Sequence, residues 1–101
     1  MQLFINEQKL KLSERLKNRI KVKFDRGLEK LLSHYQDDMK NGSLSIEKIT
    51  RAGYHIKFAM NLPGCPVNIE KTSKVLIDGI VQVRNHAKRQ IKKSLEKLRV
   101  F

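Results

Sequence analysis

The sequence predicts an α+β fold, β-α-β-β-β-α, in which a four-stranded sheet carries two long helices packed on one face. Apolar residues recur at steps of three and four along two long stretches, 12–35 and 73–99, which is the period of an amphipathic helix. Shorter stretches before and between them alternate apolar and polar residues, as half-buried strands do. Because each helix has one apolar stripe and each strand one apolar face, both helices should cover the same side of the sheet.

The chain opens with a predicted strand over residues 2–6, in which Leu3 and Ile5 share one face. Ser13 is a suitable N-cap for the first helix. The apolar stripe of that helix is formed by Leu12, Leu16, Ile20, Phe24, Leu28, Leu31, Leu32 and Tyr35. Gly27 interrupts the helix at a cost of about 1 kcal/mol relative to alanine, which a close approach of another backbone would explain.

Residues 37–43 carry turn residues without periodicity and predict the clearest break in the chain. A strand is expected over 44–50, and the strongest alternation follows over 54–61. After a turn at Pro63 and Gly64, residues 66–71 predict a last strand, which Pro66 assigns to a sheet edge. The short turns predict an antiparallel meander, and the helical crossover should return the first strand in parallel.

The last helix is expected to begin at a cap formed by Thr72 or Ser73. Its apolar stripe is formed by Leu76, Ile80, Val83, Ala87, Ile91, Leu95 and Leu98. We find no repeat or linker, and at 101 residues the chain should form one domain, 1–101.

Positive charge is concentrated on the two helices. The chain has 22 basic and 10 acidic residues, a net charge of +12. Residues 13–35 hold seven basic and three acidic residues, and residues 73–101 hold eight and two, so the helices account for +4 and +6. A charge of this size placed on two elements predicts a polyanionic partner, most commonly nucleic acid.

The candidate RNA-binding residues form rows at helical spacing. Those of the first helix are Arg15, Arg19, Lys23, Arg26 and Lys30. Those of the last helix form two rows, Arg84, Lys88 and Lys92, and Arg89, Lys93 and Lys97. The groove between the helices is then the natural track for an anion.

The sequence gives no argument for an enzyme, a cofactor or a small-molecule substrate. His34, His55 and His86 do not stand at metal-ligand spacing, so we interpret them as ordinary polar residues and expect no metal site. A single cysteine, Cys65, excludes an internal disulfide. Since the aromatic residues are few, with Tyr54, Phe58 and Phe24 on inward faces, binding is expected to depend on phosphates and on the shape of folded RNA.

We expect a cytoplasmic protein that is monomeric in free solution. No run approaches 18 apolar residues, and the start MQLFINE is too short and too polar for a signal peptide. The core should use both apolar stripes, which leaves no free face for a membrane or a second copy.

The chain resembles the ribosome hibernation-promoting factors, also called ribosome-associated inhibitors or sigma-54 modulation proteins. The resemblance rests on the opening MQLFIN, LKNRIKVKF (16–24), LEKL (28–31), YHIKF (54–58) and LIDGI (76–80). It covers nearly the whole chain and corresponds to the short form of the family, without the C-terminal dimerisation domain of longer members.

The resemblance implies binding to the small ribosomal subunit, in the channel of messenger and transfer RNA, and silencing of translation in resting cells. The basic rows would then contact ribosomal RNA phosphates. Two other readings stay open: a general module for double-stranded RNA or other nucleic acid, and an adaptor whose basic helices dock on an acidic protein or an anionic membrane.

Overall fold

The computed structural model describes residues 2–33, 35–36, 40–49, 51, 53–62 and 64–98, without the side chains of Cys65 and Leu98. His34 and Pro63, for which the sequence makes predictions, lie outside the described residues. The element order is β1 (Gln2–Gln8), α1 (Glu14–Leu32), β2 (Asn41–Ile49), β3 (Gly53–Leu62), β4 (Cys65–Ser73) and α2 (Leu76–Leu98). The predicted order of strands and helices is confirmed.

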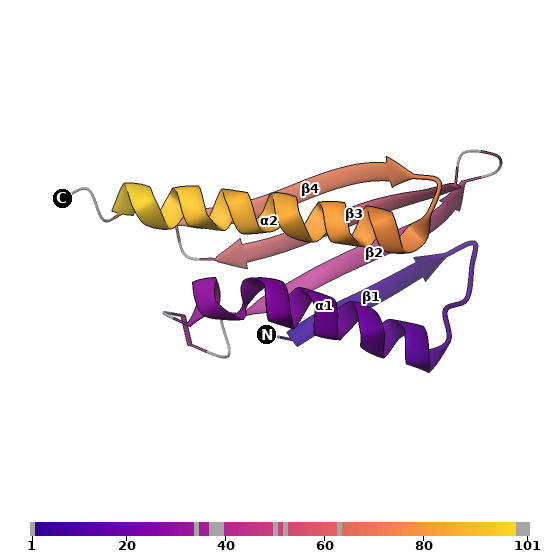
Figure 1. The fold of residues 1–101 in the computed structure, drawn as a ribbon, viewed down its shortest axis with the longest axis horizontal. Coiled ribbons are helices and arrows are strands. Elements are labelled where there is room, and N and C mark those ends of the chain that lie inside the picture. The colour runs from indigo at the N-terminus through magenta and orange to yellow at the C-terminus, as the bar shows by residue number, and fades with distance from the viewer. Residues whose placement is uncertain are drawn as a thin grey trace.

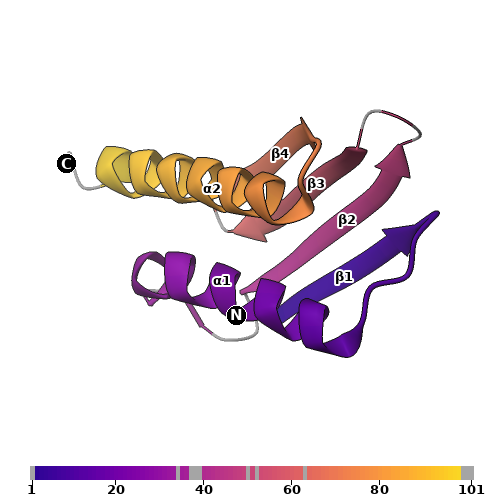
Figure 2. The ribbon, with the colours of Figure 1, turned by 45° about the vertical axis from the view of Figure 1, so that its right-hand side comes forward.

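The four strands lie in the order β1-β2-β3-β4, with β1 parallel to β2 and the other two pairs antiparallel. The parallel crossover through α1, the antiparallel meander and the edge position of β4 are therefore all as predicted. Figures 1 and 2 show both helices on the same side of the sheet, with α1 beside β1 and α2 beside β3 and β4. The opposite side, which we call the outer face, carries no helix in the described part of the chain.

The core lies between the helices and the sheet. Ile20, Phe24, Leu28 and Leu32 of α1 are buried, as are Ile80, Val83, Ala87 and Ile91 of α2. They pack against the inward residues of the strands. The rings of Phe24 and Phe58 lie at its centre, with centroids 5.0 Å apart. Every buried residue of the core in the described part of the chain is apolar apart from glycine.

Ser13 caps α1 as predicted, since its side chain accepts a hydrogen bond from the Leu16 N–H at 3.1 Å. The predicted end of the helix at Tyr35 is wrong. The Ser33 N–H turns back to the Lys30 carbonyl, at a distance of 3.5 Å, which closes the helix after Leu32. Tyr35 still packs against the core from beyond the helix.

The predicted bounds of β1 and β2 need correction. β1 continues past residue 6 because its parallel pairing with β2 extends to Gln8. The predicted break at 37–43 is wrong for its last three residues, which begin β2. Gly42 lies inward there, and a Cβ at this position would lie 3.0 Å from Phe58 and 3.3 Å from Leu3. The rest of the predicted break, 37–39, is outside the described residues, and residue 40 carries no regular structure.

The predicted cap of α2 is also wrong. Thr72 and Ser73 remain in β4, where they pair with His55 and Tyr54 of β3. The chain then turns at residues 74 and 75, and the Gly79 N–H donates to the Val75 carbonyl at 3.1 Å in the first turn of α2. The ladder pairing of β4 with β3 therefore determines where this helix begins.

Candidate nucleic-acid interface

The basic row of α1 lies on the surface of the helix, away from the sheet. Its apolar stripe is buried, and residues one turn apart lie above one another on one face. Arg15, Arg19 and Arg26 are exposed and Lys23 is partly exposed. The helix therefore presents four cations along about three turns of its outer surface.

Arg84 brings α2 into this surface by lying across α1 at Gly27. A Cβ on Gly27 would lie 2.9 Å from Cγ of Arg84 and closer still to its Cδ. The guanidinium is oriented by its neighbour, since Nε and Nη2 donate to Oδ1 of Asn85 at 3.3 and 3.1 Å. The glycine thus makes room for a side chain of the other helix, and not for its backbone as the sequence suggested.

An open hollow of about 510 Å³, which we call the basic groove, lies along α1, and Arg84 of α2 completes its lining. It is lined by Arg15, Asn18, Arg19, Val22, Lys23, Arg26 and Arg84. Five of these residues are cations and none is acidic. In the described part of the chain none of the five makes an ion pair, so their charge is available to an anionic ligand.

The other predicted residues lie outside this hollow. Lys30 is exposed one turn beyond Arg26 on α1. Lys88 and Lys92 continue the line of Arg84 along α2. Arg89, Lys93 and Lys97 follow a different line of α2, about 140° around the helix from the first at 100° per residue. The structure therefore brings together part of the predicted set and separates the two rows of α2.

Sequence reasoning missed Asn18 and Val22. Val22 is 46% exposed, and it stands among cations on a helix whose stripe was already assigned to the core. Its spacing of four residues from Asn18, within the basic row, is the signal that would have found both.

The start of α1 is fixed by a small cluster around Glu7 of β1. Its carboxylate accepts a hydrogen bond from the Leu12 N–H and pairs with Nζ of Lys17 at 2.6 Å. The bond from Lys17, then the bond from the backbone, hold the pKa of Glu7 below its usual value. The same bond raises the pKa of Lys17. Lys17 therefore acts as a structural cation at the base of α1.

One half of the outer face also carries pairs of ionisable side chains. His55 lies 3.0 Å from Glu70 across β3 and β4, and Lys9 lies 3.4 Å from Glu47. Among the described residues, no group of three or more His, Cys, Asp or Glu side chains could hold a metal ion. Within that same part of the chain, neither helix is long and apolar enough to cross a membrane.

Comparison with solved structures identifies the fold. The N-terminal domain of Thermus thermophilus Protein Y matches with a TM-score of 0.75 and 17% identity, over 92% of this chain and 98% of that one. A ribosomal subunit interface protein from Coxiella burnetii matches with a TM-score of 0.75 and 17% identity, over 95% of this chain and 99% of that one. The fold expected from the resemblance to hibernation-promoting factors is therefore confirmed.

Comparisons by sequence find no relative. No protein-family model matches the chain, and no curated protein matches it. At 17% identity, the likeness to the two solved structures establishes the fold alone.

Proposed function

We propose that the protein is a ribosome-associated translation inhibitor. In this proposal it binds small-subunit ribosomal RNA in the channel of messenger and transfer RNA and stabilises resting ribosomes in the cytoplasm. It acts by binding alone, without catalysis and without a cofactor. The observation that carries the proposal is the basic groove, in which two helices contribute five cations and no acid.

The groove is suited to phosphates. Arginine presents a planar fork of donors that matches phosphate oxygens, and four of the five cations are arginine. Contacts of this kind set the position of a protein on RNA and do not read its sequence. A folded ribosomal RNA with closely spaced phosphates is therefore a better fit than a single small anion.

The fold supports the choice of partner. One structural neighbour is named a ribosomal subunit interface protein, and its whole chain has the fold seen here. The arginine fork matches carboxylates as well as phosphates, so the structural neighbour, and not the side-chain type, favours the ribosome over an acidic protein as the partner.

The test is co-sedimentation with purified small subunits, with and without messenger RNA and initiator transfer RNA. We expect the protein to pellet with empty subunits, to be released by the two RNAs, and to inhibit translation in vitro when in excess. Simultaneous binding of the protein and P-site transfer RNA would contradict the channel as its site.

A matched pair of variants tests the groove itself. Arg19→Glu with Arg26→Glu should abolish pelleting, whereas Lys21→Glu with Lys57→Glu changes the net charge equally outside the groove and should bind more nearly as wild type does. Equal affinity for subunits and for a plain RNA duplex would favour a general double-stranded-RNA module. Pull-down that survives nuclease would favour an acidic protein partner.

A further inference from the structure

The outer face of the sheet has two unlike halves. Around the ends of β2 and β4 nearest Ser73, it carries two ionisable pairs, Lys9 with Glu47 and His55 with Glu70. The other half, at the start of β1, holds an open hollow of about 410 Å³, and among the described residues none that lines it carries an ionisable side chain. This uncharged half is lined by Phe4, Asn41, Gly42, Ser43, Ala59, Met60, Asn61, Pro66 and Asn68. The nine described residues of this lining are uncharged, on a chain in which 32% of residues are charged.

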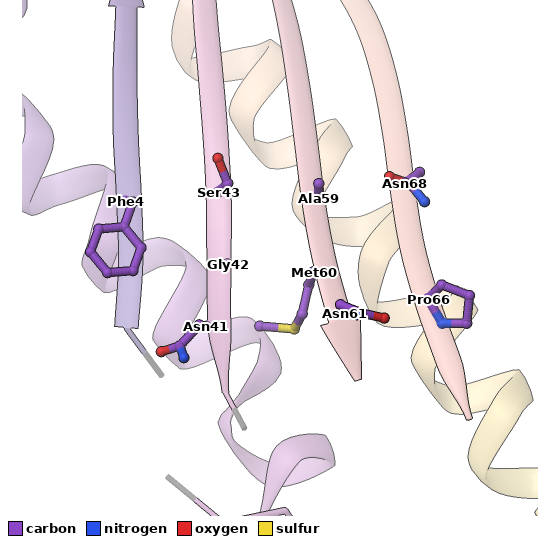
Figure 3. Close-up of a pocket in the computed structure, with 9 residues that line it drawn as sticks. All are labelled: Phe4, Asn41, Gly42, Ser43, Ala59, Met60, Asn61, Pro66 and Asn68. Atoms are coloured by element: carbon purple, nitrogen blue, oxygen red, sulfur yellow. The ribbon is translucent and has the colours of Figure 1, made fainter. Parts of the chain in front are cut away.

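An aromatic ring lies open at one side of the hollow. Phe4 is 52% exposed. Successive residues of β1 alternate between the two faces of the sheet, and this alternation places Phe4 on the outer face, away from the core. In register across the sheet it is followed by Ser43, Ala59 and Asn68. Ser43 and Ala59, the two residues nearest to Phe4 in this row, have small side chains. They leave the ring uncovered where it faces the neighbouring strands, as Figure 3 shows.

Amide side chains surround the rest of the hollow. Asn41, Asn61 and Asn68 are exposed and come from three different strands. An asparagine amide offers both a donor and an acceptor, which is the combination that the edge of a nucleobase requires. Figure 3 places Phe4 at one margin of the group and Asn68 with Pro66 at the other.

Cations lie close to this half of the sheet without lining it. A Cβ on Gly79 would lie against Ile56 of β3 and Ser73 of β4, so this flank of α2 faces the sheet on its β4 side, about 140° around the helix from the Arg84 flank that meets α1. Lys93 and Lys97 lie near the same flank of α2, about four and five turns beyond Gly79. Figure 1 shows α2 running toward the end of the sheet where β1 begins and ending beyond it. The row of Arg89, Lys93 and Lys97 therefore follows the β4 side of α2 and continues past the end of the sheet that holds the hollow.

We propose that the uncharged half of the outer face binds unpaired nucleotides of RNA, with a base stacked on Phe4 and base edges contacted by the asparagine amides. The phosphates of the same segment lead over the edge of β4 to Arg89, Lys93 and Lys97. Aromatic residues on an open sheet are a known platform for single-stranded RNA. The inference rests on the proposed function, because it names a second RNA element, single-stranded, on the face opposite the basic groove.

The chemistry of the surface favours this occupant over two others. A second copy of the chain would bring a further charge of +12, and the two copies would repel each other. An acidic peptide would find no cation in the hollow itself. An RNA segment fits both the uncharged hollow and the cations of α2, since its bases are uncharged and its phosphates are anionic.

Tryptophan fluorescence gives a direct test, because the chain has no tryptophan. In Phe4→Trp, excitation at the red edge of the spectrum reports on this position alone. We expect quenching by a decamer of uridine or adenosine and none by an RNA duplex of equal length, whose bases are already paired. Absence of quenching by saturating decamer would overturn the proposal.

Affinity for a fluorescein-labelled decamer provides the second readout. Phe4→Ala should weaken binding about 5- to 150-fold, the range found when a stacking side chain is removed, and leave binding to the duplex and to small subunits through the groove nearly unchanged. Val75→Ala is the matched control, since Val75 is 54% exposed near the opposite end of the sheet. Equal binding of the decamer by Phe4→Ala and wild type, with both folded by circular dichroism, would refute the site.

The remaining outcomes separate the alternatives. Self-association that depends on concentration and is lost in Phe4→Ala would assign the surface to a second copy and overturn the RNA assignment. Loss of duplex and subunit binding in Arg19→Glu with Arg26→Glu, but not in Phe4→Ala, would support the proposed function and show that the basic groove acts separately from the sheet-face site. If Arg19→Glu with Arg26→Glu binds small subunits as wild type does, the proposed function is contradicted, whatever the effect of Phe4→Ala on decamer binding.

Discussion

Gly27 and Arg84 form one unit, in which the missing side chain of one residue positions the other. Gly27→Ala should displace the stem of Arg84 from α1 and weaken binding to RNA, because the guanidinium leaves the basic groove. Arg84→Ala should weaken binding to a similar extent. The measurement is affinity for an RNA duplex, titrated with each single variant and with the double variant.

The double variant decides whether the two residues act together. In the Arg84→Ala background, Gly27→Ala should cost no further affinity and should stabilise the protein by up to about 1 kcal/mol, since alanine is the better helix former and the clash is gone. In the wild-type background, Gly27→Ala should stabilise the protein by less, because the clash with Arg84 remains. Additive losses of affinity would show that Gly27 does not act through Arg84.

Glu7 makes stability depend on pH at the acidic end. Its pKa is lower in the folded chain than its ordinary value of 4.5, because Lys17 and the Leu12 N–H bind the charged carboxylate. The contribution to stability is therefore present above about pH 4.5 and is lost as pH falls through the lowered pKa. Thermal melts of wild type and Glu7→Gln should differ at neutral pH and converge at low pH.

The matched control for this experiment is Glu29→Gln, which removes an exposed carboxylate elsewhere on α1. It should follow the wild-type melting curve at every pH. A difference between wild type and Glu7→Gln that does not shrink on acidification would mean that the carboxylate contributes through its shape and not through its charge.

At the scale of elements, the two basic rows of α2 should have separate roles. Lys88→Glu with Lys92→Glu alters the row that continues from Arg84, and should lower affinity for duplex RNA roughly tenfold or more by removing phosphate contacts. Arg89→Glu with Lys93→Glu changes the charge equally on the other row. It should affect duplex binding less and decamer binding more. Equal losses from both pairs would mean that charge, and not its place on the helix, determines binding.

The periodicity of the sequence was enough to predict the elements, their order and the common side of both helices, because burial of one face leaves a repeating pattern in the chain. The ends of the elements were harder. Asn41 and Gly42 have the composition of a turn, and only the packing of Gly42 against Phe58 and Leu3 explains why they begin a strand. Likewise Ser73 resembles a cap, but its pairing with Tyr54 keeps it in β4.

The candidate site was predictable to the extent that it follows helical spacing. The row from Arg15 to Arg26 could be found in this way and lies along the basic groove. The inclusion of Arg84, and the exclusion of Lys97, depend on how two helices far apart in sequence pack together. Phe4 could be assigned to the outer face by alternation, but not to a hollow, since that depends on small residues in β2 and β3.

For the whole molecule we expect a monomer in free solution. The core uses the apolar stripes of both helices, and a charge of +12 opposes association of two copies. Light scattering at moderate protein concentration should give a mass near the chain mass of 11.8 kDa. A mass of twice that value at physiological salt would contradict the expectation.

The net charge also predicts how binding responds to salt. If binding neutralises roughly six to ten phosphates, duplex DNA as a reference suggests a fall in affinity of about 10³–10⁵-fold between 50 and 200 mM salt. Folded ribosomal RNA already holds magnesium, so the fall for small subunits should be smaller than this but still steep. Titrations at several salt concentrations give the slope of log affinity against log salt, and Lys88→Glu with Lys92→Glu should make that slope shallower. The decamer should lose less affinity over the same range, because stacking on Phe4 does not release counterions. An affinity for small subunits that stays constant across this range would show that the basic groove does not carry the binding.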